Sequence, residues 1–256
     1  MAIDLEGIAV LADDRVVVLA ERLRALIGME GIVVEYGTPL TEFGNRGLEG
    51  VAVQRLSDGT SKVAVLWEGG YPEHQAIPEQ LRSMVRHMPL RPVIWIHELT
   101  KGQTGVHVRD DGKHGVVPHS LSLDVPEVDD KPPPQAQQFR ANDLVWHELN
   151  KDTHEWGFIV LLSSENSPRE GQWSFQYQWL QRFNTSGQRV GIPLDLNGVL
   201  PEGLQHRNWE GLGWYEMQKR LVLVHDSLPA RHPNRIRTRD TCGLVRHDAA
   251  MGLPPA

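Results

Sequence analysis

Residues 173–179 constrain the fold most strongly, because their side chains alternate strictly between two kinds. Every odd position carries an aromatic ring, and every even position carries Ser or Gln. Successive side chains of a β-strand point to opposite faces, whereas a helix would distribute these rings around its axis. The alternation therefore predicts a strand whose aromatic face packs inward, and it favours small β units with aromatic cores.

The best helix candidate is residues 13–27. The apolar positions at helical spacing in this segment are Val16, Leu19, Leu23, Leu26 and Ile27. An apolar stripe of this kind normally faces a core. Asp13 can cap the start and Gly28 can end the helix. We therefore expect one N-terminal helix that packs against a neighbouring β unit.

A proline-rich segment, residues 124–138, interrupts the β-like pattern. It contains three consecutive prolines and several acids, and it offers almost nothing to bury. Such a composition is typical of an extended, semi-rigid linker. We expect a division into residues 1–123, with the helix and one or two β units, a linker, and residues 139–256, with a second β lobe and a basic C-terminal segment.

Composition excludes several classes of protein. A net charge of −7 over 256 residues argues against a generally basic nucleic-acid-binding surface, although it leaves room for a local basic patch. The single cysteine, Cys242, excludes a disulfide framework and a cysteine-based zinc site within one chain. The N-terminus is acidic, and no apolar run is long enough to span a bilayer. We expect a cytoplasmic protein with no membrane partner.

Short motifs recur along the chain. An apolar-Pro-x-x-Leu motif occurs at residues 77–81, 117–121 and 200–204, and Trp95 and Trp146 each open a Trp-(Ile)-His-Glu-Leu motif. Gly50, Gly105 and Gly157 each precede a short apolar run. Glycine lets a strand bend sharply, and proline after a strand stops pairing because it lacks a donor.

The order of these motifs resembles the SH3-like small β-barrels, especially the Tudor and KOW types. The resemblance covers residues 31–84, 92–122 and 140–207. It implies a mainly β fold of tandem SH3-like barrels, each with about five strongly bent antiparallel strands. It also implies binding of peptides, modified side chains or nucleic acid, but a fold does not settle which of these is bound.

Histidine–acid pairs are the obvious candidates for catalysis or metal binding. They are His97-Glu98, His147-Glu148, His225-Asp226 and His247-Asp248. None continues into a His-Glu-x-x-His motif, and adjacent residues of a strand point to opposite faces. The sequence also lacks a nucleophile elbow, a phosphate-binding loop and a dinucleotide fingerprint. We therefore assign no catalytic residue, metal ligand or cofactor.

Exposed aromatic and basic residues are the best binding candidates. Trp156, Tyr71 and Trp209 lie in polar or glycine-rich surroundings, where a ring could contact a peptide. A basic segment contributes Arg231, Arg235, Arg237 and Arg239, suited to phosphates or carboxylates. The prediction is a non-enzymatic adaptor that binds a protein partner. The alternatives are a nucleic-acid-binding protein that uses the basic segment and, third, a metal-dependent hydrolase.

Overall fold

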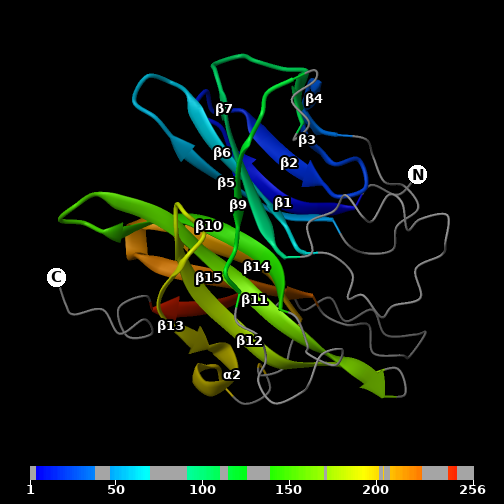
Figure 1. Ribbon diagram of the computed structural model, residues 1–256, viewed down its shortest axis with the longest axis vertical. Helices are drawn as coiled ribbons and strands as arrows, with labels where there is room; N and C mark the ends of the chain where they lie inside the picture. The colour runs from blue at the N-terminus through cyan, green and yellow to red at the C-terminus, as the bar shows by residue number, and fades with distance from the viewer. Residues whose placement is uncertain are drawn as a thin grey trace.

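The computed structural model describes residues 4–37, 47–69, 91–109, 115–125, 139–169, 172–201, 204, 208–226 and 242–246. These residues form a mainly β protein, as the sequence predicts (Figure 1). The strands belong to four sheets, each an open row of strands. Among the described residues, no helix has the length and apolar character needed to cross a membrane.

The N-terminal half contributes the first and second sheets. The first sheet has the order β1 (Leu5–Val10), β2 (Val16–Ala20), β3 (Ala25–Gly28), β4 (Gly31–Tyr36) and β8 (Val106–Val108), and β8 pairs in parallel with β4. The second sheet has the order β5 (Leu48–Arg55), β6 (Ser61–Trp67), β7 (Val93–Leu99) and β9 (His119–Ser122), all antiparallel.

The C-terminal half contributes the third and fourth sheets, both antiparallel. The third sheet contains β10 (Arg140–Asn150), β11 (Glu155–Arg169), β12 (Gln172–Asn184) and β13 (Arg189–Asp195) in that order. The short helix α2 (Leu196–Val199) follows it. The fourth sheet contains β14 (Asn208–Tyr215), β15 (Arg220–Asp226) and β16 (Cys242–Arg246), and the 3₁₀ turn η1 (Glu216–Gln218) joins the first two strands.

The four sheets stack as layers (Figure 1). The buried apolar residues form one core at each junction between them. Alternate residues of β6 show the plan: Val63 and Val65 belong to the first core, between the first two sheets, whereas Ala64 and Leu66 belong to the second core, between the second and third sheets. On β11 the residues alternate between the second core and a third core, which lies between the third and fourth sheets. The two inner sheets are therefore buried on both faces.

The second core contains residues from both sides of the expected linker. Leu66, Ile94 and Leu121 from the second sheet pack with Phe158 and Val160 from the third sheet. The N-terminal and C-terminal halves of the chain thus share the second core. Most of the expected linker, residues 126–138, lies outside the described residues, and the division into domains stays a prediction.

The predicted N-terminal helix is wrong. Residues 13–27 form β2, a turn and β3, in which Leu19 pairs with Leu26 across the hairpin. Arg24 has a positive φ of 47° and donates its backbone N–H to the carbonyl of Glu21, so a helix cannot pass through it. The consecutive β-branched residues of β2 favour a strand. Because the segment is apolar at most positions, its helical spacing did not discriminate between the two structures.

The predicted strand over residues 173–179 is confirmed as part of β12. Tyr177 and Trp179 pack against the second core, and the rings of Trp179 and Phe139 lie 4.5 Å apart. Gln178 is fully buried on the opposite face, because that face is covered too. The alternation therefore predicts the strand correctly but does not identify a solvent-exposed face.

The Pro-x-x-Leu motifs occupy different surroundings. Leu121 lies on β9 and packs in the second core, whereas Leu204 follows α2, packs against the third core and donates its N–H to the carbonyl of Pro201. The motif at residues 77–81 lies outside the described residues. The two described motifs therefore do not mark equivalent ends of a repeated unit, and the described sheets are open layers.

Candidate cation site

Carboxylates from two hairpins converge at one end of the stacked sheets. The hairpins β1–β2 and β5–β6 open side by side there: the N–H of Glu21 bonds to the carbonyl of Asp4 at 2.9 Å, and the N–H of Glu68 bonds to the carbonyl of Gly47 at 3.2 Å. Two overlapping sets of carboxylates result, each with oxygen atoms within 4.8 Å of one another. We call them together the carboxylate cluster: Asp4, Glu6 and Glu21 form one set, and Glu21, Glu49 and Glu68 form the other.

One part of the carboxylate cluster is tied into the fold. Glu68 is fully buried and accepts hydrogen bonds from the N–H of Gly47 at 2.9 Å and from Nε of Arg140 at 2.6 Å. Nη2 of Arg140 also lies 3.9 Å from Oε1 of Glu49. Since Arg140 begins β10, this part joins the second sheet to the third and has an evident structural role.

The other part of the carboxylate cluster lacks such partners. Glu21 is only 7% exposed, yet among the described residues no hydrogen bond or ion pair reaches its carboxylate. Asp4 pairs with the half-exposed Arg22 at 3.3 Å. A Cβ on Gly47 would lie 2.5 Å from Cγ and 2.7 Å from Oε1 of Glu21. A side chain at position 47 would therefore collide with Glu21, and the N–H of Gly47 donates to Glu68 and not to Glu21.

Burial and mutual repulsion raise the pKa values of three carboxyl groups of the cluster. Burial, followed by repulsion from Glu21 and Asp4, raises the pKa of Glu6 to about 7. Burial, followed by repulsion from Glu68 and Asp4, raises the pKa of Glu21 to about 7, although Arg22 and Arg140 oppose the shift. Burial and the nearby Glu68 also raise the pKa of Glu49 well above its usual range, although Arg140 opposes this. Without a further cation, the cluster favours protonation near neutral pH.

The residue types of the carboxylate cluster suit a hard cation. Ca²⁺, Mg²⁺ and Mn²⁺ prefer carboxylate and carbonyl oxygens, whereas zinc and copper sites normally use histidine or cysteine. The set supplies three carboxylates: Glu6 lies on β1, Asp4 directly precedes that strand, and Glu21 lies in the turn after β2. Water would complete the coordination of such an ion.

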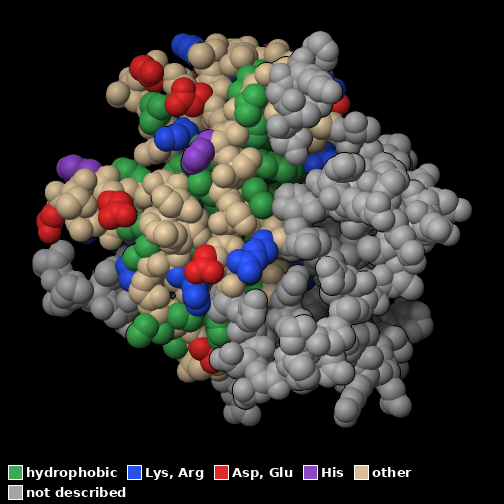
Figure 2. Space-filling view, viewed as in Figure 1, with side chains coloured by type: hydrophobic (Ala, Val, Ile, Leu, Met, Phe, Trp, Pro, Cys, Tyr) green, Lys and Arg blue, Asp and Glu red, His purple; other side chains and the backbone are tan. Residues whose placement is uncertain are grey.

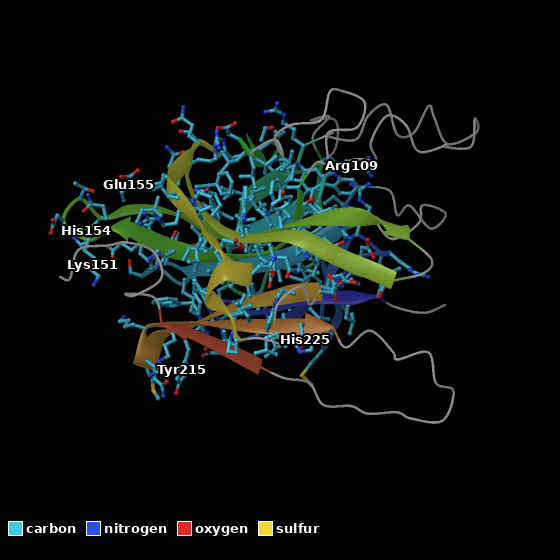
Figure 3. The ribbon with its side chains drawn as sticks, turned by 90° about the horizontal axis from the view of Figure 1, so that it is seen from below. Arg109, Lys151, His154, Glu155, Tyr215 and His225 are labelled. Carbon is cyan, nitrogen blue, oxygen red and sulfur yellow. The ribbon has the colours of Figure 1, made fainter. Side chains whose placement is uncertain are left out.

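Trp156 is the predicted binding residue that the structure leaves accessible. It lies on β11 opposite Glu148, and 37% of it is exposed. The β10–β11 hairpin projects from the stack, with Lys151, His154 and Glu155 at its tip (Figure 3). Nδ1 of His154 lies 2.8 Å from Oε1 of Glu148. Charged and histidine side chains gather at this tip in the space-filling view (Figure 2).

Trp209 does not provide the exposed ring that the sequence suggests. It is fully buried in the third core, its ring packs edge-on against His225 with centroids 5.1 Å apart, and its carbonyl accepts a hydrogen bond from Nδ2 of Asn142 at 2.8 Å. The polar residues that flank Trp209 lie on β14, an edge strand of the fourth sheet, and the inner face of that sheet packs in the third core. The remaining predicted binding residues lie outside the described residues: Tyr71, Arg231, Arg235, Arg237 and Arg239.

The described histidine–glutamate pairs lie as strand alternation requires. His97 is buried in contact with Tyr36, at 3.4 Å between Nε2 and the hydroxyl oxygen, while Glu98 is exposed. Burial lowers the pKa of His97 to about 4, so the ring is neutral. His147 packs edge-on against Trp214, with centroids 5.1 Å apart. Neither histidine belongs to the two groups of described residues that could hold a metal.

Sequence reasoning missed the carboxylate cluster because its members occur singly between residues 4 and 68. A local signal existed, since Glu49 and Glu68 lie at the ends of strands whose central positions are apolar. A charged residue adjoining a strand buried on both faces needs a partner. The sequence does not show that partner.

Comparison with known proteins gave no relative on which to base a function. No protein-family model matches the sequence, no curated protein matches it, and no solved structure matches the fold.

Proposed function

We propose that this protein binds a divalent cation through Asp4, Glu6 and Glu21, and that the cation stabilises the junction of the β1–β2 and β5–β6 hairpins. The observation that carries the proposal is Glu21, a carboxylate that is 7% exposed and has no hydrogen bond or ion pair among the described residues. Burying an uncompensated charge is costly, and a bound cation offsets that cost.

The charge balance supports the proposal. Five carboxylates lie in the cluster, and the described arginines that form ion pairs with them include Arg22 and Arg140. Arg140 lies against Glu68 and Glu49, and the half-exposed Arg22 pairs with Asp4. A divalent ion between Glu6 and Glu21 would neutralise the carboxylates that have the fewest partners. This function needs no catalytic residue and is consistent with a binding protein.

Thermal unfolding in the presence of cations tests the proposal. After EDTA treatment, CaCl₂, MnCl₂ or MgCl₂ is added at constant ionic strength, and we expect a saturable rise in Tm with at least one of them. At one hundred times Kd, the stabilisation is about 2.7 kcal/mol, or roughly 5–10 °C for a chain of this size.

Two variants separate a specific site from general ionic effects. Glu21→Gln removes one ligand charge while keeping the shape, and it should abolish the rise in Tm. Glu98→Gln removes an exposed carboxylate on β7, and this variant should still show the rise in Tm. The proposal is rejected if no cation raises Tm, or if Glu21→Gln responds as the wild type does.

A second candidate function is recognition of a protein partner by the β10–β11 hairpin, as an adaptor would do. The partly exposed ring of Trp156 beside the His154–Glu148 pair supports it, because partly exposed tryptophans often anchor interfaces. Peptides selected for binding to the wild type should bind Trp156→Ala at least about tenfold more weakly, a hot-spot effect. Tyr215→Ala, which removes a similarly exposed ring on β14, is the control. Equal peptide binding by the two variants would exclude the β10–β11 hairpin as the binding site.

Tandem SH3-like barrels and nucleic-acid binding by residues 231–239 also remain proposals that rest on sequence. The nucleic-acid proposal predicts affinity for an oligonucleotide that falls steeply with salt. If fluorescence anisotropy detects no binding of the oligonucleotide at low salt, the nucleic-acid proposal is rejected.

A further inference from the structure

The edge strand β13 contains a bulge. Leu180 pairs with Leu194 and Arg182 pairs with Val190, so three residues of β13 face only Gln181 on β12. These three residues are Gly191, Ile192 and Pro193, and Ile192 is 86% exposed. Nε2 of Gln181 fills the gap and donates to the carbonyls of Arg182 at 2.9 Å and Val190 at 3.2 Å. Bulges at sheet edges often redirect a side chain beside a functional site.

The side chain of Arg182 lies against this bulge. A Cβ on Gly191 would lie only 2.6 Å from Nη2 of Arg182, and Gly191 has a positive φ of 70°. Glycine is therefore required at this position for two reasons: the backbone conformation and the close approach of the guanidinium. The guanidinium reaches the edge of the third sheet under the backbone of β13.

Among the residues that the structure describes, Arg182 has no partner for its charge. It is 9% exposed, its Nε is buried without a hydrogen bond, and no described residue forms an ion pair with it. Burial lowers its pKa, the direction expected when no anion compensates the loss of water.

Two acidic residues at the ends of β13 have other partners. Asp195, at the end of β13, accepts a hydrogen bond at 3.0 Å from the N–H of Asn197 and caps α2. Asp124 pairs with Arg189 at 3.1 Å at the beginning of the strand. Within the described ranges, the exposed Arg189 thus has a carboxylate partner and the buried Arg182 has none. A buried charge without a partner lowers stability, which a hydrophobic side chain of similar size would not do.

We propose that Arg182 and the Gly191–Pro193 bulge form a binding site for an oxyanion, that is, a phosphate or carboxylate group of a ligand. The planar guanidinium can donate two parallel hydrogen bonds to such a group, and its position under an edge strand makes it reachable from outside the sheet. The site lies on the third sheet and does not depend on the carboxylate cluster.

Anion-dependent stability tests the site. Sodium phosphate or sodium acetate is added to the wild type, with sodium chloride at matched ionic strength as the reference. We expect a saturable rise in Tm of about 2–5 °C at ten times Kd. A larger effect of phosphate indicates a phosphate-bearing ligand, and an equal or larger effect of acetate indicates a carboxylate ligand.

Two arginine variants provide the controls. Arg182→Met should abolish the anion effect and, without anion, should have a Tm equal to or above that of the wild type. Arg189→Met alters a more exposed arginine of β13 and should retain the effect. In the wild type, the NMR resonance of the Arg182 Nε–H group should shift as phosphate is added, a measurement that needs no variant. No saturable effect of either anion, or an unchanged effect in Arg182→Met, overturns the proposal.

Discussion

Asp143 and Glu21 are both buried carboxylates, and their surroundings differ in one respect. Asp143 accepts hydrogen bonds from the N–H groups of Leu212 at 2.6 Å and Leu144 at 2.7 Å, and so joins β10 to β14. Glu21 has no such donors among the described residues. Burial raises the pKa of both groups, but at Asp143 the two backbone hydrogen bonds oppose the shift. Burial alone therefore does not distinguish the two carboxylates; the number of hydrogen-bond donors does, and it is the basis for proposing a ligand at Glu21.

The largest expected effect comes from removing the satisfied carboxylate. Asp143→Ala leaves two buried N–H groups without acceptors, and we expect a loss of about 2–4 kcal/mol in the free energy of unfolding. Asp143→Asn keeps one acceptor oxygen and should lose less. Urea denaturation measures both variants. A loss below about 1 kcal/mol for Asp143→Ala would show that water replaces the carboxylate, and the contrast with Glu21 would disappear.

A smaller loss is expected from crowding the same carboxylate. A Cβ on Gly50 would lie 2.4 Å from Oδ1 and 3.0 Å from Cα of Asp143, so Gly50→Ala should cost about 1–3 kcal/mol through overpacking. Gly213→Ala on β14 is the matched control, because the nearest atom to its Cβ, on Val222, would be 3.9 Å away. Equal losses in the free energy of unfolding for the two variants would indicate an effect of alanine on the backbone and not a steric effect on Asp143.

The smallest effect concerns the pH dependence of Glu21, measured in EDTA. The folded-state pKa of Glu21 is about 7, above its ordinary value of 4.5, so its contribution is fully present below pH 4.5 and is lost as the pH rises through 7. Glu21→Gln should equal the wild type at pH 4.5 and exceed it by about 1–2 kcal/mol at pH 8. Because buried His97 changes stability in both proteins, only the difference between their urea curves is informative. A difference that does not change with pH would contradict the prediction.

Local patterns predicted only part of this molecule. The strict alternation of residues 173–179 identifies β12 because a period of two is a property of the strand itself. Residues 13–27 are apolar at both spacings, so the choice between helix and hairpin depended on the positive φ at Arg24, which sequence does not reveal. The continuous apolar run at residues 158–162 was a signal for a strand covered on both faces, and it indicates the layered arrangement in retrospect.

The candidate sites were harder to predict than the fold. The carboxylate cluster depends on two hairpins that open at the same end. The position of the Arg182 guanidinium depends on the bulge in β13, where Gly191 has no side chain to block it. In both sites the informative feature is a buried charged side chain, Glu21 or Arg182, for which the described part of the fold provides no hydrogen-bond or ion-pair partner. A sequence shows which charged residues exist but not which of them the fold leaves unpaired.

The shared second core limits how far this chain can be dissected. A fragment ending before residue 124 would keep the second sheet but lose Phe158 and Val160, which cover one of its faces. A fragment beginning at residue 139 would lose Leu66 and Ile94 in the same way. Each truncated piece would present a bare apolar sheet to water and would tend to aggregate, so the two halves should regain their native form only when they are mixed.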